Sequence, residues 1–140
     1  MLAAFPLLAL PVLLYNLLML TISGGFGGGG AGQRLSAPLI SLKMASHAVW
    51  PISLGDVLIA GSLLILFAEL LKSAGTRRIA ILNHSLSMIL FIVCLIEFLL
   101  FPAFATSTFF LIALMVLLDV LAGFVVTIIA ARRDVDFRPE

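Results

Sequence analysis

The sequence predicts an all-α integral membrane protein with four transmembrane helices. The 140 residues are 63% hydrophobic and only 11% charged, with a mean hydropathy of +1.28, whereas soluble domains are about 25% charged. Four apolar runs approach the ~20 residues that cross ~30 Å of hydrocarbon. They occupy residues 2–22, 56–71, 79–101 and 108–131. Because the connections between them are short, residues 1–140 are predicted to form one membrane domain.

A secretory signal peptide is the alternative reading of the first run. No Lys or Arg precedes this run, and no clear small-x-small cleavage site follows it, so we expect an uncleaved helix. Seven of residues 23–32 are glycine, and their backbone entropy opposes a helix. Residues 23–34 are therefore predicted to be a flexible tether. They lack the Gly-Lys-Ser/Thr ending of a phosphate-binding loop.

Apolar and polar residues alternate over residues 39–54, on both sides of the segment Ala-Ser-His-Ala. This period of two predicts a short β-hairpin at the membrane surface, packed on the helix ends through Leu42, Trp50 and Ile52. Pro51 would confine its strand to an edge. The alternative is an irregular interfacial loop in which Trp50 anchors the chain at headgroup depth.

The basic residues predict one topology. The second run begins at Asp56, which is placed to cap its first turn, and the third stops at Pro102. An uncharged connection leads to the fourth run, and a polar tail follows over residues 132–140. All eight basic residues lie outside the runs, and those that flank the last three runs are Lys72, Arg77, Arg78, Arg132 and Arg133. The positive-inside rule then predicts cytoplasmic termini, with the tether and the hairpin on the opposite side.

Polar residues inside the runs recur at helical spacing, which predicts stripes that face protein rather than lipid. The third run carries such a stripe at steps of four and three, and the fourth and second runs carry one each. These stripes are Asn83, Ser87, Leu90, Cys94 and Glu97; then Thr108, Met115, Asp119, Ala122 and Ala130, with Gly123 beside them; and Ser62 with Glu69.

Three carboxylates, Glu97, Asp119 and Glu69, are predicted to lie at successive depths, as a ladder across the bilayer. One interpretation is a proton or cation path. The interpretation that we favour is that protonated Glu97 and Asp119 donate interhelical hydrogen bonds, because polar groups commonly join spans in this way. Glu69 is expected to pair with Lys72 one turn away.

His84 is a weak candidate for a pigment ligand, because Ala80 precedes it at the Ala-x-x-x-His spacing of antenna helices that bind bacteriochlorophyll. We expect instead a hydrogen bond from His84 to Asn83, Ser87 or Glu69, and we expect no bacteriochlorophyll. The single cysteine, Cys94, excludes an intramolecular disulfide and a multi-cysteine metal site, so it is expected simply to pack. We expect bound lipid but no metal or other cofactor.

Catalytic fingerprints are absent from the sequence, which has neither a Ser-His-Asp set nor a His-Glu-x-x-His motif, so we expect no enzyme. The basic residues form no cluster that would bind nucleic acid. The remaining partners are the lipid bilayer and other integral membrane proteins, or further copies of the chain itself.

Residues 39–133 resemble a group of small, uncharacterised bacterial four-span inner-membrane proteins, on the segments LISLKMASHAVWPISLGD, FAELLK, LNHSLSMILFIVCLIEFLLFPAFATSTFFLIALM and LLDVLAGF. The resemblance implies the architecture and a bacterial inner membrane, but no activity. The expected function is a non-catalytic subunit or scaffold within a larger respiratory, photosynthetic or transport complex. The alternative is a small homo-oligomeric proton or cation channel or transporter that uses the intramembrane carboxylates.

Overall fold

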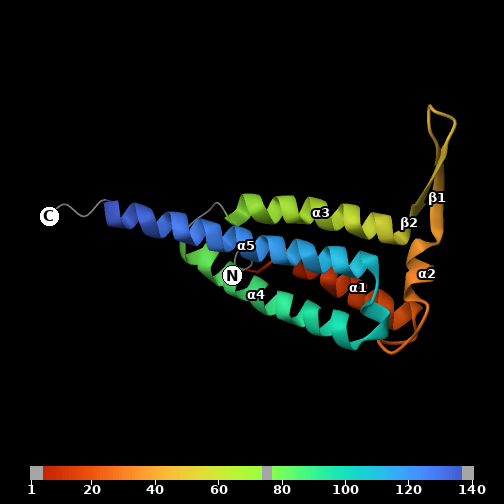
Figure 1. The fold of residues 1–140 in the computed structure, drawn as a ribbon, viewed down its shortest axis with the longest axis horizontal. Coiled ribbons are helices and arrows are strands. Elements are labelled where there is room, and N and C mark those ends of the chain that lie inside the picture. Colours follow the sequence, from red (N-terminus) through yellow and green to blue (C-terminus); the bar gives the residue numbers. More distant parts are fainter. Residues whose placement is uncertain (1–4, 74–76, 137–140) are drawn as a thin grey trace.

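The computed structural model describes residues 5–73 and 77–136. The chain is mostly helical, with one small antiparallel sheet, and the helices lie alongside one another while the sheet projects sideways from one end of the bundle (Figure 1). Helix α5 is central, because it packs against both α3 and α4. In chain order the elements are α1 (Ala9–Ile22), α2 (Ala31–Ser36), β1 (Pro38–Lys43), β2 (Val49–Ser53), α3 (Leu54–Ser73), α4 (Arg77–Leu100), the 3-10 helix η2 (Pro102–Phe104) and α5 (Ser107–Asp136).

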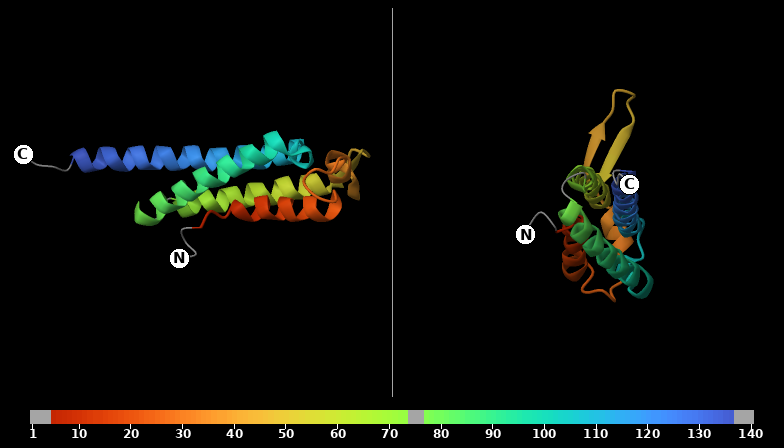
Figure 2. Two further views of the ribbon diagram at one scale, coloured as in Figure 1. Left: turned by 90° about the horizontal axis from the view of Figure 1, so that it is seen from below. Right: turned by 90° about the vertical axis from the view of Figure 1, so that its left-hand side faces the viewer.

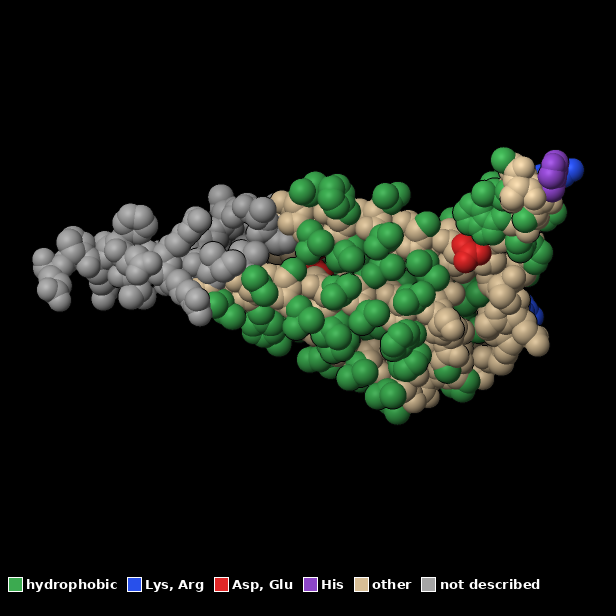
Figure 3. All heavy atoms as spheres, turned by 45° about the horizontal axis from the view of Figure 1, so that its top comes forward, with side chains coloured by type: hydrophobic (Ala, Val, Ile, Leu, Met, Phe, Trp, Pro, Cys, Tyr) green, Lys and Arg blue, Asp and Glu red, His purple; other side chains and the backbone are tan. Residues whose placement is uncertain are grey.

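Three helices among the described residues, α3, α4 and α5, are long and apolar enough to cross a membrane. Their outward side chains are apolar, and Figure 3 shows them covering one face of the bundle. The predicted fourth span at residues 2–22 is not confirmed. Helix α1 has only 14 residues, or roughly 21 Å of helix. Residues 5–8 form a bend and a turn before it, and residues 1–4 lie outside the described part of the chain.

The ends of the long helices differ slightly from the sequence prediction. Helix α3 starts at Leu54 because Ser53 and Asp56 form a capping box. Asp56 Oδ2 accepts the backbone N–H of Ser53 at 2.9 Å and its hydroxyl at 2.6 Å, and Ser53 Oγ accepts the Asp56 N–H at 3.2 Å. Helix α5 continues to Asp136, so the first part of the predicted polar tail is helical, whereas residues 137–140 lie outside the described residues. Alanine and arginine favour helix strongly, which explains the extension.

The glycine-rich segment, which the sequence predicts to be a flexible tether, contacts the bundle through Phe26. The Phe26 ring packs against Phe101 and Phe104 at centroid distances of 5.7 and 5.2 Å, and the carbonyl of Phe26 accepts the Ala103 N–H at 3.2 Å. Helix α2 follows at Ala31–Ser36, and its Leu35 is buried in the core. One aromatic side chain and one short helix therefore attach this segment to the bundle, and its flexibility stays a prediction.

The predicted hairpin is confirmed, but its predicted packing is wrong. Strands β1 and β2 pair antiparallel, with Leu42 opposite Trp50 and Ile40 opposite Ile52. Leu42 is 45% exposed and Trp50 is 50% exposed, while only Ile52 is half-buried. The two strands project sideways, away from the bundle, instead of lying across the helix ends (Figure 1). They could not pack as predicted because α2 and the start of α3 already occupy that end of the bundle.

An aromatic cluster closes the hairpin end of the bundle, where α1 meets η2 and α5. Tyr15, Phe104 and Phe109 have no exposed surface, and the ring of Tyr15 lies 5.4 Å from that of Phe104 and 4.7 Å from that of Phe109. The Tyr15 hydroxyl donates to the Ala103 carbonyl at 3.1 Å and lies 2.6 Å from Thr106 Oγ1. Figure 2 shows α1 running along the bundle towards this end. The cluster therefore anchors α1 to the loop between α4 and α5.

Candidate functional site: a buried polar cluster

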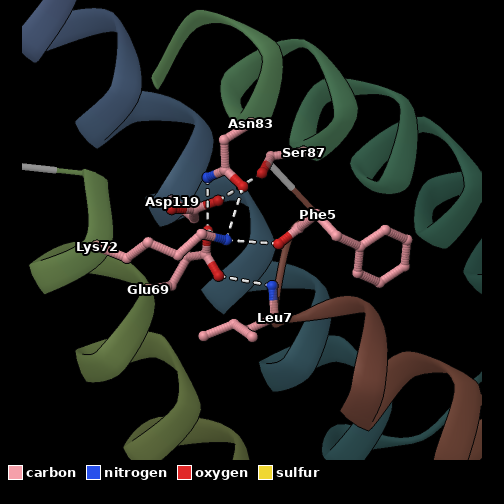
Figure 4. A network of polar contacts seen from close by, with 7 residues as sticks. All are labelled: Phe5, Leu7, Glu69, Lys72, Asn83, Ser87 and Asp119. Atoms are coloured by element: carbon pink, nitrogen blue, oxygen red, sulfur yellow. Dashed lines mark hydrogen bonds and ion pairs between the residues drawn. The ribbon is translucent and has the colours of Figure 1, made fainter. Parts of the chain in front are cut away.

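A cluster of five polar residues lies in the half of the bundle opposite the hairpin (Figure 4). Glu69 and Ser87 have no exposed surface, and Asn83 and Asp119 are each 4% exposed. Helices α3, α4 and α5 all contribute to this polar cluster, which consists of Glu69, Lys72, Asn83, Ser87 and Asp119. The predicted stripes of α3, α4 and α5 thus face the protein interior where their side chains are described.

Glu69 is the centre of the polar cluster, since it accepts hydrogen bonds from three other residues. Its Oε1 accepts the Asn83 amide at 2.5 Å and the Lys72 ammonium at 3.2 Å. Its Oε2 accepts the backbone N–H of Leu7 at 2.6 Å. The predicted pair of Glu69 with Lys72 is therefore present, and the carboxylate also binds a second helix and the segment that precedes α1.

Lys72 completes this arrangement. Its ammonium donates to Asn83 Oδ1 at 3.1 Å and to the carbonyl of Phe5. A backbone N–H or carbonyl without a partner is costly in an apolar environment. Glu69 binds the N–H of Leu7 and Lys72 binds the carbonyl of Phe5, so α3 holds the segment that leads into α1.

Ser87 and Asp119 form the second part of the polar cluster. The Ser87 hydroxyl donates to Asp119 Oδ2 at 2.6 Å, which joins α4 to α5. Asp119 also lies close enough to Glu69, Lys72 and His84 to interact with them electrostatically. Asp119 and Glu69 therefore belong to one local group.

Glu97 lies apart from the polar cluster, to which the other two carboxylates of the predicted ladder belong. It follows Ser87 by ten residues on α4, or roughly 15 Å along a helix. Its polar neighbour is the Asn16 amide of α1, and its buried Oε2 accepts no hydrogen bond from the described residues. Asn16 could have been found from the sequence, because it is the one amide within the first apolar run.

His84 does not make the predicted hydrogen bond. Both of its ring nitrogens are buried and lack a hydrogen-bond partner among the described residues. The ring instead packs edge-on against Phe124, at 4.5 Å between centroids and 77° between planes. A Cβ at Gly123 would lie 2.4 Å from His84 Nδ1, so the glycine allows α5 to approach this ring closely. Asn83 and Ser87 are already bonded to Glu69 and Asp119, which leaves His84 to pack.

Two further residues singled out from the sequence, Cys94 and Trp50, lie outside the polar cluster. Cys94 is a free, buried thiol that packs in the hydrophobic core. Trp50 stands on the exposed hairpin, so its role as an interface anchor stays a prediction. Within residues 5–73 and 77–136, no three His, Cys, Asp or Glu side chains lie close enough together to hold a metal ion.

The arrangement can fix the helices in register, because Glu69, Lys72 and Asn83 join α3 to α4 and to the segment before α1, while Ser87 and Asp119 join α4 to α5. Composition and spacing could not reveal the backbone partners of Glu69 and Lys72, since no side-chain pattern encodes them. In comparisons with known proteins, no family model, curated protein or solved structure matches the chain.

Proposed function

We propose that this chain is a non-catalytic integral membrane subunit or scaffold that packs within a larger respiratory, photosynthetic or transport complex. The observation that carries the proposal is the β1–β2 hairpin. Its strands pair only with each other in the described chain, and on one face Ile40, Leu42 and Trp50 are 61%, 45% and 50% exposed. An isolated two-stranded hairpin is marginally stable in water. An apolar hairpin that projects beyond its own bundle is suited to contact a neighbouring protein.

The polar cluster favours a structural role over the alternative channel. Its groups form hydrogen bonds within the cluster, and the region between Asp119 and Glu97 is apolar. Buried side chains fill it, including Cys94, Met115 and Val116. A proton or cation path would need polar groups or water in this region, so the packing supports hydrogen bonds that hold the helices in register.

The proposal places the protein in a bacterial inner membrane with both termini in the cytoplasm. The end of α3, the start of α4 and the end of α5 lie at the same end of the bundle (Figure 1). The sequence at these ends carries Lys72, Arg77, Arg78, Arg132 and Arg133, and such residues favour the cytoplasmic side. The bacterial source rests on the resemblance of residues 39–133, and residues 2–22 are proposed to complete a fourth crossing.

The composition of the native particle tests the proposed subunit role. After purification in mild detergent, we expect mass spectrometry to find a particle that contains other integral proteins. Substitution of the hairpin with Leu42→Ser and Trp50→Ser should release them. The control Leu64→Ser, at a position that is 72% exposed on α3, should retain them. A particle that contains only copies of this chain would contradict the proposal.

Ion flux tests the channel alternative directly. The purified protein in liposomes should conduct neither protons nor cations, and Asp119→Asn should leave this unchanged. Flux through the wild-type protein that Asp119→Asn abolishes would instead support the channel. For the topology, reporter fusions after Arg78 and after Arg133 should both report cytoplasm, and a signal from the opposite side at either position would overturn it.

A further inference from the structure

A cavity of about 410 Å³ lies at the hairpin end of the bundle, between α2 and the starts of α3 and α5. Both helices are candidate spans that begin here, so the cavity lies where a bilayer would present its headgroups. Hydroxyls and one carboxylate line it, together with a few apolar side chains: Ser53, Asp56, Ser107 and Thr108, with Leu35 and Ile59.

The first turn of α5 supplies one wall of the cavity with hydrogen-bond donors. Thr106 caps the helix, since its Oγ1 accepts the Phe109 N–H at 3.2 Å and its carbonyl accepts the Phe110 N–H at 3.0 Å. The N–H groups of Ser107 and Thr108 make no hydrogen bond to any residue that the structure describes. A helix start of this kind carries partial positive charge and favours an anion.

Thr108 gives independent evidence for a ligand. The residue is only 8% exposed and it lines the cavity, and its hydroxyl has no hydrogen-bond partner within the described part of the chain. Most polar groups in a protein interior have a partner, and a group bound in the cavity could supply one here. Gly55 allows the start of α3 to approach this hydroxyl closely, since a Cβ there would lie 2.7 Å from Thr108 Oγ1.

Asp56 provides the opposite charge. Its Oδ2 accepts both hydrogen bonds from Ser53, while its Oδ1 accepts none from the described residues. The carboxylate is solvent-exposed and remains available to a cation. A cavity with anion donors on one wall and a carboxylate on another suits a zwitterion better than a simple anion or cation.

We propose that this cavity binds the headgroup of a zwitterionic aminophospholipid. The phosphate would accept hydrogen bonds from the start of α5 and from the Thr108 hydroxyl, and the ammonium would pair with Asp56. Leu35 and Ile59 would contact the glycerol and the first carbons of the acyl chains, which then continue into the bilayer. A soluble phosphorylated amine shares the headgroup chemistry, so the experiment must separate it from the lipid.

To test the proposal, phosphatidylethanolamine or phosphatidylglycerol is added to the protein in detergent, and native mass spectrometry measures how much of each lipid stays bound. The wild type should retain one phosphatidylethanolamine and prefer it over phosphatidylglycerol, which lacks the ammonium. Thr108→Val should lower the occupancy about fivefold, the equivalent of one hydrogen bond, and Thr108→Ser should restore it. Asp56→Asn, which can still accept from Ser53, should abolish the preference for phosphatidylethanolamine.

Matched controls keep the test independent of folding. Thr21→Val removes an exposed hydroxyl that donates to the Leu17 carbonyl on α1 and should leave lipid retention unchanged. All variants should first show the wild-type Tm. Equal retention of the two lipids by the wild type, or unchanged retention in Thr108→Val, would overturn the proposal. Displacement of the lipid by an equal concentration of phosphorylethanolamine would overturn the lipid assignment in favour of a soluble ligand.

Discussion

The two halves of the bundle hold α1 in different ways. At its start, Glu69 and Lys72 bind the backbone of Leu7 and Phe5 through charged hydrogen bonds. At the other half, Tyr15 inserts into a cluster of phenylalanine rings and makes its polar contacts through a single hydroxyl. One attachment depends on complementary charge and the other on shape.

The difference follows from the solvent that surrounds the helices. Lipid is as apolar as leucine, so burial of apolar surface between spans gives little driving force, and packing and hydrogen bonds must supply it. The aromatic cluster gains from close packing even if one hydrogen bond is lost. The Glu69–Lys72 pair stabilises only as a complete set, because each group that loses its partner stays buried and unpaired.

The largest expected effect is therefore at Glu69. Glu69→Leu leaves the amide of Asn83 and the N–H of Leu7 without their acceptor and removes the carboxylate that pairs with the Lys72 ammonium. We expect it to lower the free energy of unfolding by about 3–5 kcal/mol, as for the loss of one partner of a buried ion pair. Unfolding in detergent can be followed by labelling Cys94, whose side chain has no exposed surface in the fold.

The double variant is the control for this effect. Lys72→Met in the Glu69→Leu background removes the unpaired charge and should recover part of the lost stability. If Glu69→Leu unfolds like the wild type, the charged attachment of α1 contributes nothing and the contrast between the two halves fails.

A smaller effect is expected at Tyr15. Tyr15→Phe keeps the ring packing against Phe104 and Phe109 but removes the hydroxyl that contacts Ala103 and Thr106. We expect a loss of about 1–2 kcal/mol, the range for one or two neutral hydrogen bonds, measured by the same labelling of Cys94. A loss as large as that of Glu69→Leu would mean that polar contacts dominate both halves.

The parts of the fold that the sequence predicts are those with a repeating pattern. The three long helices follow from apolar runs, the buried faces of α3 and α4 follow from the spacing of Glu69, Asn83 and Ser87, and the hairpin follows from alternation around Ala45–Ala48. Each depends on residues close in the chain, whose period reports a local conformation.

The parts that could not be predicted depend on contacts between distant residues. Leu7 is 62 positions from Glu69, and the bond uses its backbone N–H, which no residue type reveals. Phe26 attaches a glycine-rich loop to rings about 75 residues away in the chain. His84 lacks its expected hydrogen bond because two of the expected partners, Asn83 and Ser87, bond to carboxylates on other helices instead.

The smallest expected effect lies in the hairpin, which belongs to neither half of the bundle. His47 adopts φ +63°, the only positive φ at a non-glycine residue that the structure describes. It ends a turn in which the His47 N–H donates to the Met44 carbonyl at 2.9 Å and the Met44 N–H donates to the Ala48 carbonyl at 2.8 Å. This left-handed conformation costs an L-residue roughly 1–2 kcal/mol. Glycine avoids this cost, but its more flexible unfolded state offsets part of the gain in stability.

His47→Gly should therefore stabilise the hairpin by about 0.5–1 kcal/mol and slow hydrogen exchange at the Met44 amide about two- to fivefold. The free energy of unfolding measured at Cys94 should not change, because β1 and β2 are exposed outside the core. Ser46→Gly is the control, since Ser46 is not among the residues with positive φ, and it should speed exchange at the same amide. Slower exchange in both variants would mean that the gain is not specific to the positive φ of His47, and unchanged exchange in His47→Gly would mean that this turn carries no strain. A change at Cys94 would mean that the hairpin and the bundle unfold as one unit.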